Sequence, residues 1–519
     1  MTGGTTDTDT DAVVVGAGHN GLVAAWYLTR AGLRVEMFER RPFAGGAVLT
    51  EELWPGYRFS TCAHSVHALH PKIIRDLALR ERGFEVLPRS FPDVLIKPDG
   101  TYYGPPDHDS PKNIAFSARL SAAECQGMAQ LSDFKATLEA LVAPYRMGLP
   151  PSFAEIRAKA AGTHAAEVFE QAITCTVSQI RARCLPTARL LDRYASERAA
   201  VGRDPLALSY AYSAIDAAEE STGEAPPLGY VRGGMGELSR TLIEAVQEAG
   251  VKIHVGQEVE RFLVEGGSVI GIRLAGGAEV RSRVVLSNLD TKRTFLRLFA
   301  PQHLDAAFRQ RVGGLVTGIS CFKLLVALSE LPHWKDWDGD PESPSSGKVG
   351  LHRTQAHIAA AYDDLEAGRP PREMVINVSI PSAVDPSLAP PGGHTASCYI
   401  YPAPGSLRAG TWDDARDSVA ERIIDQITRY APNFRRSIRH YKLRTPLDLE
   451  RENGLTDGCI VHVEQTGEQL LWNRPLPELA HYRAPLRGLY LCGSGQHPGG
   501  EVSGQPGHNA AHEVLKDLS

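Results

Sequence analysis

The first hydrophobic run of the chain, Ala12–Val15, is short and passes directly into glycine-rich sequence. This pattern predicts a buried strand of a parallel sheet. Apolar residues then recur at helical spacing over Asn20–Ala31, and Gly32 follows as a natural helix end. Leu33–Phe38 has the pattern of a second strand. Strand, helix and strand in this order predict the start of a doubly wound α/β sheet.

The pattern changes in the next part of the chain. Apolar residues recur at helical spacing within Ala122–Tyr145 and Phe153–Arg181, and prolines interrupt the pattern at 150, 151 and 186. We therefore expect residues 112–200 to form a helical insert.

The first pattern returns at residues 228–290. A glycine-rich turn at 233–236 opens a predicted helix, Glu237–Ala249, which Gly250 closes. The predicted strands of this part are Lys252–Val255, Glu258–Val264, Val269–Leu274 and Val284–Leu286. Farther along, the predicted strands are 316–328, Val375–Ile380, Ala396–Tyr401 and Gly488–Leu491, and the predicted helices are Asp414–Tyr430 and Gln505–Leu518.

Sequence of the nucleotide-binding type thus lies at the start, middle and end of the chain. The expected fold is α/β, with a Rossmann-type domain formed by residues 11–100, 226–300 and 484–519. Residues 101–225 would be the helical insert, and residues 301–483 a second, α+β substrate domain with a mixed sheet. Residues 1–10 are Thr-, Asp- and Gly-rich and are expected to be a disordered tail.

Composition narrows the choice of function. The 519 residues suggest two or three packed units, and neither the net charge of −6 nor any basic run favours nucleic acid. The tail has no apolar stretch for a secretory signal, and no apolar run is long enough for a transmembrane helix. Eight cysteines without a CxxC pair suit a reducing compartment. We expect a cytoplasmic protein, with peripheral membrane contact left open.

A GxGxxG motif, Gly16-Ala17-Gly18-His19-Asn20-Gly21, connects the first strand to the helix. Gly16 allows the tight turn, Gly18 lets the backbone approach a pyrophosphate, and Gly21 lets helix and strand pack closely. Glu39, at the end of the second strand, can accept hydrogen bonds from a ribose diol and disfavours a 2′-phosphate. The helix N-terminus supplies N–H groups for phosphate. Together these features predict a dinucleotide site that does not take NADP.

The residues after this acid resemble an extended fingerprint. Glu39-Arg40 followed by Gly45-Gly46 is similar to the flavoprotein superfamily that holds amine oxidases, phytoene desaturases and Rab GDP-dissociation inhibitors. The resemblance implies FAD as the cofactor, with the second glycine pair near the diphosphate. Members of the family often have arginine next, whereas this chain has Ala47, so a side-chain contact to phosphate is in doubt.

Residues 488–512 resemble the second flavin-contacting segment of that superfamily. A strand leads into a glycine-rich loop and a helix, whose N-terminus would stabilise negative charge on a reduced flavin. Ser494 stands where the family often has aspartate. The closest resemblance is to the phytoene desaturase-like branch with the pyridine nucleotide-disulphide oxidoreductase domain-containing proteins. Glu501 and Gln505 depart from its usual glycine and alanine, and are either substrate-specific groups or a solvated carboxylate and a capping amide.

Candidate site residues follow from the motifs and the resemblance. The expected cofactor-binding residues are Gly16, Gly18, Asn20, Gly21, Glu39, Arg40, Gly45, Gly46, Ala47, His64, Ser65, Val259, Asn288, Gly493, Ser494, Glu501 and Val502. The expected catalytic residues are His64, His497, Glu501 and Gln505. Strand packing is the alternative for Val259, and a loop-stabilising hydrogen bond is the alternative for His497.

Three other groups have weaker claims. His64, His67 and His70 are three apart, but no acid completes a metal site, so we expect none. His462 is expected to pack on a strand face. The aromatic residues Tyr399, Tyr401 and Trp472 either wall an apolar pocket or belong to the core.

The functional hypothesis is an FAD-dependent oxidoreductase that takes two electrons from an organic substrate. The reaction would be a desaturation or a C–N or C–C oxidation, and an apolar substrate is one option. A second GxGxxG motif after a strand is missing, so O₂, a quinone or another carrier would take the electrons. The rival hypotheses are a binding protein on the same fold, as the GDP-dissociation inhibitors are, and a redox-neutral flavin isomerase.

Overall fold

The computed structural model describes residues 10–195, 201–212, 224–225, 227–351 and 354–519. The expected disordered tail, residues 1–10, lies outside the described residues except for Thr10. In the described part of the chain, no helix is long and apolar enough to cross a membrane.

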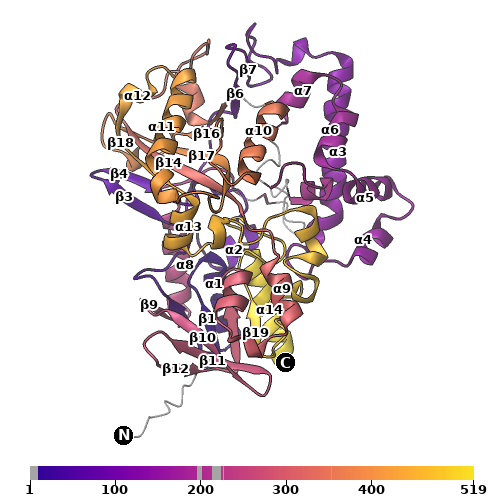
Figure 1. Cartoon of the computed structure of the whole chain (residues 1–519), viewed down its shortest axis with the longest axis vertical. Coiled ribbons are helices and arrows are strands. Elements are labelled where there is room, and N and C mark those ends of the chain that lie inside the picture. The colour runs from indigo at the N-terminus through magenta and orange to yellow at the C-terminus, as the bar shows by residue number, and fades with distance from the viewer. Residues whose placement is uncertain (1–9, 196–200, 213–223, 226, 352–353) are drawn as a thin grey trace.

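A five-stranded parallel sheet forms the centre of the Rossmann-type domain (Figure 1). In spatial order its strands are β19 (Leu489–Leu491), β13 (Val284–Ser287), β1 (Ala12–Val15), β2 (Val35–Glu39) and β9 (Lys252–Val255). They come from three distant parts of the chain, as the sequence predicts. The central strand β1 is buried on both faces, which explains its uninterrupted apolar sequence.

Both faces of this sheet are covered. Helices α1 (His19–Arg30), α8 (Gly236–Glu248) and α14 (Gln505–Leu518) pack on one face, in a core that includes Leu22, Leu238 and Val514. The other face packs against a three-stranded sheet of β10 (Val259–Glu265), β11 (Ser268–Leu274) and β12 (Glu279–Arg281).

The second domain is built on a seven-stranded mixed sheet. Its spatial order is β18 (Ile438–Arg444), β14 (Ile319–Leu328), β17 (His394–Pro404), β16 (Val375–Ser379), β15 (Lys348–Leu351), β6 (Val94–Ile96) and β7 (Tyr102–Tyr103). Only the β15–β6 pair is parallel among these described strands. Helix α11 (Trp412–Tyr430) packs on one face through Val419, Ile423 and Ile427. The expected two-domain α/β architecture is confirmed.

The expected domain boundary at residue 100 is wrong. Because β6 pairs with β15, residues 94–103 belong to the sheet of the second domain. The hydrophobic pattern could not reveal this, since Val94 pairs with Val349, in a distant part of the sequence. Short strands that the pattern also missed are β3 (Thr50–Trp54), β4 (Tyr57–Ser60), β5 (Val86–Leu87) and β8 (Tyr230–Val231).

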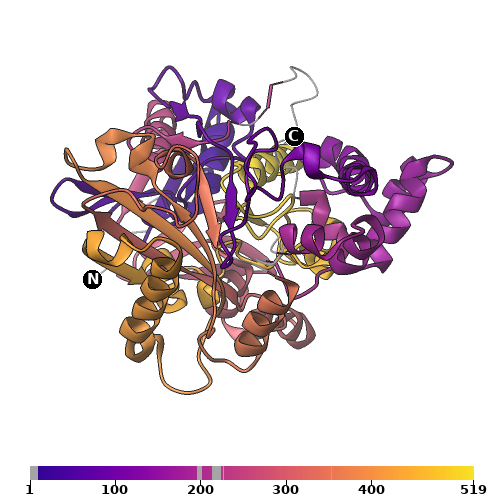
Figure 2. The same ribbon diagram turned by 90° about the horizontal axis from the view of Figure 1, so that it is seen from above.

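The helical insert projects from one side of the molecule (Figure 2). The predicted helical segment Phe153–Arg181 is three helices, because Thr163 and Thr176 each cap the start of a new one. The helices of the insert are α3 (Ala122–Val142), α4 (Phe153–Ala160), α5 (His164–Thr174), α6 (Val177–Cys184) and α7 (Ala188–Arg193). The remaining helices are α2 (Pro71–Asp76), α9 (Ala306–Gly313), α10 (Gln355–Glu366), α12 (Phe434–Ser437) and α13 (Pro446–Asn453).

The first and last helices of the chain meet at a glycine. A Cβ atom on Gly507 of α14 would lie 2.0 Å from the carbonyl oxygen of Asn20 in α1. Real Cβ atoms do not approach a backbone oxygen so closely, so only glycine allows this contact between the helices.

We therefore predict that Gly507→Ala lowers the free energy of unfolding by about 1–3 kcal/mol, the usual cost of overpacking. Gly276→Ala is the matched control, because a Cβ atom there would meet nothing within 4 Å. Thermal unfolding followed by circular dichroism measures both variants. Equal melting temperatures for the two would show that α1 and α14 do not pack as described.

Candidate active site

Two glycine-rich turns stack backbone against backbone at the end of β1. Gly18 and Gly45 form an isolated bridge, and Gly45 donates its N–H to the Ala17 carbonyl at 2.9 Å. Gly46 has a φ of +60°, and a Cβ atom on it would lie 2.8 Å from the Cα of Gly18. The chain therefore needs glycine here to bring the two turns together, and the resulting surface is bare backbone that a ligand can approach closely.

Glu39 is fixed at the end of β2 beside this surface. Its carboxylate accepts the backbone N–H groups of Ala17 and Arg41, each at 3.0 Å. Arg41 in turn donates to the Gly46 carbonyl at 2.6 Å, and Arg40 donates to the Arg451 carbonyl at 2.9 Å. The acid is thus held in place by backbone donors while it lines the cavity described below.

The C-terminal loop lies directly against the first turn. The Asn20 side-chain amide donates to the Ser494 hydroxyl at 3.1 Å, a contact between residues 474 positions apart in the sequence. Asn288 donates to the Gly16 carbonyl at 3.3 Å, and Cys492 donates to the Ser287 carbonyl at 2.9 Å. Residues at the carboxyl ends of β1, β13 and β19 therefore form one continuous wall.

Arg474 holds the other side of the C-terminal loop, and its side chain is fully buried. It donates to the backbone carbonyls of Val461, Val463, Glu464, Gln469, Ser494 and Gln496, the shortest of these bonds being 2.9 Å to Ser494. The guanidinium thus ties the loop to segment 461–469. The sequence contains no motif around Arg474 that could have revealed this role.

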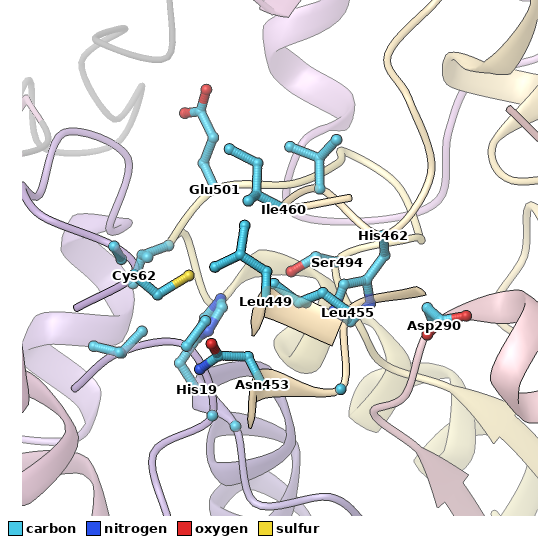
Figure 3. Close-up of a pocket in the computed structure, with 18 of the residues that line it drawn as sticks. His19, Cys62, Asp290, Leu449, Asn453, Leu455, Ile460, His462, Ser494 and Glu501 are labelled. Atoms are coloured by element: carbon cyan, nitrogen blue, oxygen red, sulfur yellow. The ribbon is translucent and has the colours of Figure 1, made fainter. Parts of the chain in front are cut away.

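A cavity of about 940 Å³ runs along these elements (Figure 3). It extends from Glu39 and Val259 past Gly18 to Tyr399 and Tyr401 of the second domain. This volume is at the upper end of the usual range for ligand sites. Of the expected cofactor residues, those that line it are Gly16, Gly18, Glu39, Arg40, Gly46, Ala47, His64, Ser65, Val259, Asn288, Ser494, Glu501 and Val502.

The other expected cofactor residues support the wall without lining it. These are Asn20, Gly21, Gly45 and Gly493. Asn20 is 1% exposed, and its amide bonds Ser494. Gly493 packs against the backbone of residues 288 and 289.

Two of the four expected catalytic residues do not line the cavity. His497 is buried and donates from Nε2 to the Tyr145 carbonyl at 2.9 Å, and burial lowers its pKa to about 3. Gln505 is buried at the first position of α14. The structure therefore favours the loop-stabilising alternative for His497, and it places Gln505 in the helix start.

His64 and Glu501 do line the cavity. The His64 ring stacks against Tyr399 at a centroid distance of 6.2 Å, and burial, with the Lys323 ammonium as a lesser cause, lowers its pKa well below the ordinary value. Glu501 accepts a hydrogen bond from His67 Nε2 at 2.9 Å, and both side chains are partly exposed, at 26% and 40%. This pair therefore lies at the rim of the cavity.

The sheet of the second domain supplies the floor of the cavity. Successive side chains of a strand alternate between faces, so Cys321 and Lys323 of β14, like Tyr399 and Tyr401 of β17, face the cavity together. Residues on the opposite face of the same strands, such as Phe322, belong to the apolar core. Tyr399 and Tyr401 confirm the expected aromatic wall, whereas Trp472 packs with Phe153 and Phe169 in the insert.

Lys323 and Arg444 are two further buried cations. Lys323 donates to the carbonyls of Ser60 and Cys62 at 3.0 and 2.7 Å, and Arg444 donates to Thr61 at 3.0 Å. Burial lowers the pKa of Lys323 to about 8. Three successive carbonyls are thus held by the second domain, which fixes the segment that leads to His64.

The expectation for His462 is wrong. It lies in a loop with a φ of +64°, not on a strand, and it lines the cavity together with His19 and Glu464 (Figure 3). Burial lowers the pKa of His19 to about 4. His19 lies within the GxGxxG motif, where its position could have drawn attention, but nothing near His462 or Glu464 in the sequence signals a site.

The three histidines at 64, 67 and 70 have separate partners. His67 bonds Glu501, and His70 accepts the Lys72 N–H at 3.2 Å as the cap of α2. Among the described residues, no group of three or more His, Cys, Asp or Glu side chains is arranged to hold a metal ion.

These features fit a dinucleotide better than any other ligand. The bare backbone at Gly18 and Gly46, the N-terminus of α1 and the acid at the end of β2 match the needs of diphosphate and ribose. The Ser494 loop and the N-terminus of α14 lie farther along the same wall, where a flat ring system would meet them.

Comparison with known proteins gives concordant results. A family model described as flavin containing amine oxidoreductase matches residues 21–515. Pyridine nucleotide-disulfide oxidoreductase domain-containing protein 2 of Rattus norvegicus is 34% identical, over 98% of this chain and 94% of its own. One subunit of the limonene dehydrogenase of Castellaniella defragrans is 26% identical, over 98% and 95%. A solved structure of putrescine oxidase with bound putrescine covers 98% of each chain at a TM-score of 0.64 and 16% identity, which shows a shared fold.

Glu501 has a left-handed backbone, with a φ of +73°. This conformation costs a residue with a Cβ atom about 1 kcal/mol or more, and glycine avoids the cost. Glu501 therefore bears strain at the rim of the cavity, where its side chain meets His67.

We predict that Glu501→Gly is more stable than Glu501→Ala by about 1 kcal/mol. Both variants lose the hydrogen bond to His67, so only the backbone strain separates them. Chemical denaturation of the two proteins measures the difference. An alanine variant as stable as the glycine variant would mean that residue 501 is not held in the left-handed region.

Proposed function

This chain belongs to the flavin-containing amine oxidoreductase family, and from that premise we propose that it is an FAD-dependent oxidoreductase that removes two electrons from an organic substrate. The observation that carries the proposal is the meeting of the GxGxxG turn and the C-terminal loop along one cavity. A cavity that begins at a ribose-binding acid and ends between tyrosines has room for a dinucleotide and for a substrate beyond it.

FAD would be held from both ends. Gly16, Gly18 and the N-terminus of α1 suit the diphosphate, and Glu39 suits the adenosine ribose. Ser494 and the N-terminus of α14 suit the edge of the flavin where charge gathers on reduction. Ala47 leaves no arginine side chain next to the second glycine pair, so backbone N–H groups would carry most of the diphosphate contact. When bound, a flavin accepts two electrons as a hydride.

The part of the cavity beyond the cofactor would position the substrate. His64, Tyr399 and Tyr401 line this part, and each is buried away from bulk water or only partly exposed. Enclosure of this kind excludes water and aligns a C–H bond for transfer. The bond oxidised would be a C–C or C–N bond, as limonene dehydrogenase and putrescine oxidase illustrate for the fold by their names. The hydroxyl, ammonium and amide groups on the floor support a substrate with a polar group.

We further propose that the electrons pass on to O₂, a quinone or another carrier. The part of the chain that the structure describes has one GxGxxG turn after a strand, at Gly16–Gly21, and the proposal assigns this turn to FAD. A nicotinamide would therefore not be the partner.

The direct test is anaerobic mixing of the FAD-loaded chain with candidate substrates. Benzylamine, putrescine, cyclohexylamine and limonene sample C–N and C–C bonds, and loss of the visible flavin absorbance reports electron transfer. The proposal predicts bleaching by at least one organic compound and recovery of the colour with O₂ or a quinone. A purified chain that takes up no FAD would point to a binding protein. Bound FAD that stays oxidised while a compound is isomerised would point to a redox-neutral enzyme.

Glu39 provides a second test, of the cofactor contact. In Glu39→Gln one acceptor oxygen becomes a donor, so two backbone N–H groups and the ribose compete for the oxygen that remains. We expect the dissociation constant for FAD to rise about tenfold or more, equivalent to about 1.4 kcal/mol.

Glu36→Gln is the matched control, because Glu36 lies on the same strand but bonds Thr10 and His254 instead. Quenching of FAD fluorescence on binding measures both variants. The same affinity in Glu39→Gln and wild type would place the ribose elsewhere.

A further inference from the structure

Glu464 is a buried acid on the wall of the cavity. Only 2% of the residue is exposed, and it lines the same space as Tyr399 and Tyr401. It belongs to segment 461–469, which Arg474 ties to the C-terminal loop. The carboxyl group therefore has a fixed place between the proposed flavin loop and the floor of the second domain.

Its surroundings leave this carboxyl without an ion pair. The Cys459 thiol donates to Oε1 at 3.3 Å, and no Lys, Arg or His nitrogen in the described part of the chain lies within ion-pair distance of the carboxyl group. The nearby Arg474 reaches the Glu464 backbone carbonyl at 3.5 Å. A buried acid without a cation is costly when it is ionised.

The consequence is a shifted titration. Burial raises the pKa of Glu464 to about 8, while the Cys459 thiol, the Arg474 charge and the Ile319 backbone oppose the shift. The titratable groups that face it are Tyr362 of α10, Tyr399 of β17 and Cys321 of β14, and burial raises the pKa of each of them also. All three are neutral near pH 8. Glu464 is thus able to change charge close to neutral pH.

Other groups on the wall are less suited to accept a proton. Lys323 already carries a proton and bonds two carbonyls. Asp290 accepts hydrogen bonds from Thr456 and from the backbone N–H of Arg293. Glu501 lies at the rim and bonds His67. His64 has its pKa lowered well below the ordinary value, so it is a weak base.

We infer that Glu464 is the catalytic base of this cavity, accepting the proton that leaves the substrate during its oxidation. The inference rests on the proposed function. One C–H bond of the substrate breaks with its electron pair, which goes as a hydride to the flavin as oxidant. The neighbouring carbon or nitrogen loses a proton to the Glu464 carboxylate, and the electrons of that bond form the new C=C or C=N bond. A base with a pKa near the working pH is effective in such a step.

The first test needs no substrate. The folded-state pKa of about 8 lies above the ordinary value of 4.5, so the folded chain keeps a proton that the unfolded chain loses. The contribution of Glu464 to stability is present below pH 4.5 and is lost as the pH rises to about 8. Wild type should therefore lose stability relative to Glu464→Gln across this range. A constant difference between the two proteins would show that Glu464 titrates normally.

The second test measures proton uptake when the bound flavin is reduced by dithionite under anaerobic conditions. Near the pKa of Glu464, wild type should take up more protons per electron pair than Glu464→Gln. Glu124→Gln is the control, because Glu124 is a buried acid far from the cavity whose role at the third position of α3 glutamine can also fill. Its uptake should match that of wild type. Equal uptake in wild type and Glu464→Gln would overturn the inference.

Cys459→Ala guards against a glutamine variant that fails to fold. Loss of the thiol donor should raise the pKa of Glu464, so the pH at which uptake changes should move upward. An unmoved pH profile would overturn the inference. A wild-type chain that takes up no FAD would contradict the proposed function instead, so the two failures are distinguishable.

Discussion

The structure depends on the contact between the first helix of the chain and the loop before its last helix. The Asn20 amide meets the Ser494 hydroxyl at 3.1 Å, and the helices that carry these two segments can meet because Gly507 has no side chain. Residues 474 positions apart are thereby brought onto one wall. Without this contact the turn that suits a diphosphate and the loop that suits a flavin ring would be two unrelated glycine-rich surfaces.

The other walls of the cavity are held by cations that bond backbone carbonyls. Arg474 binds six carbonyls of two loops, and Lys323 and Arg444 bind three successive carbonyls of residues 60–62. Multiple hydrogen bonds offset the cost of burying each charge and fix irregular loops that no strand or helix supports. The cavity is thus preformed, which favours catalysis by alignment. Against these walls Glu464 differs, because its buried carboxyl group has no cation within ion-pair distance among the described residues and can change charge.

The sequence predicts this fold well where the signal is local. The run Ala12–Val15, the GxGxxG turn and the closing segment each contain their whole pattern within a few residues, and the structure brings them together at one sheet. The predicted boundary at residue 100 fails because β6 pairs with a strand far away in the sequence. The strand predicted at His462 fails because apolar neighbours hide a turn with a positive φ. Arg474 and Glu464 give no signal, since their roles arise only from what surrounds them after folding.

The most direct test of the account is the identity and amount of flavin in the purified chain. The protein, saturated with a mixture of FAD and FMN and then washed, would be denatured so that the released flavin can be identified and counted. The account predicts one FAD per chain and no FMN, because the adenosine end of the cavity at Glu39 is needed to hold the cofactor. Release of FMN in equal amount, or of no flavin at all, would contradict the claim that the two ends of the chain bind one dinucleotide.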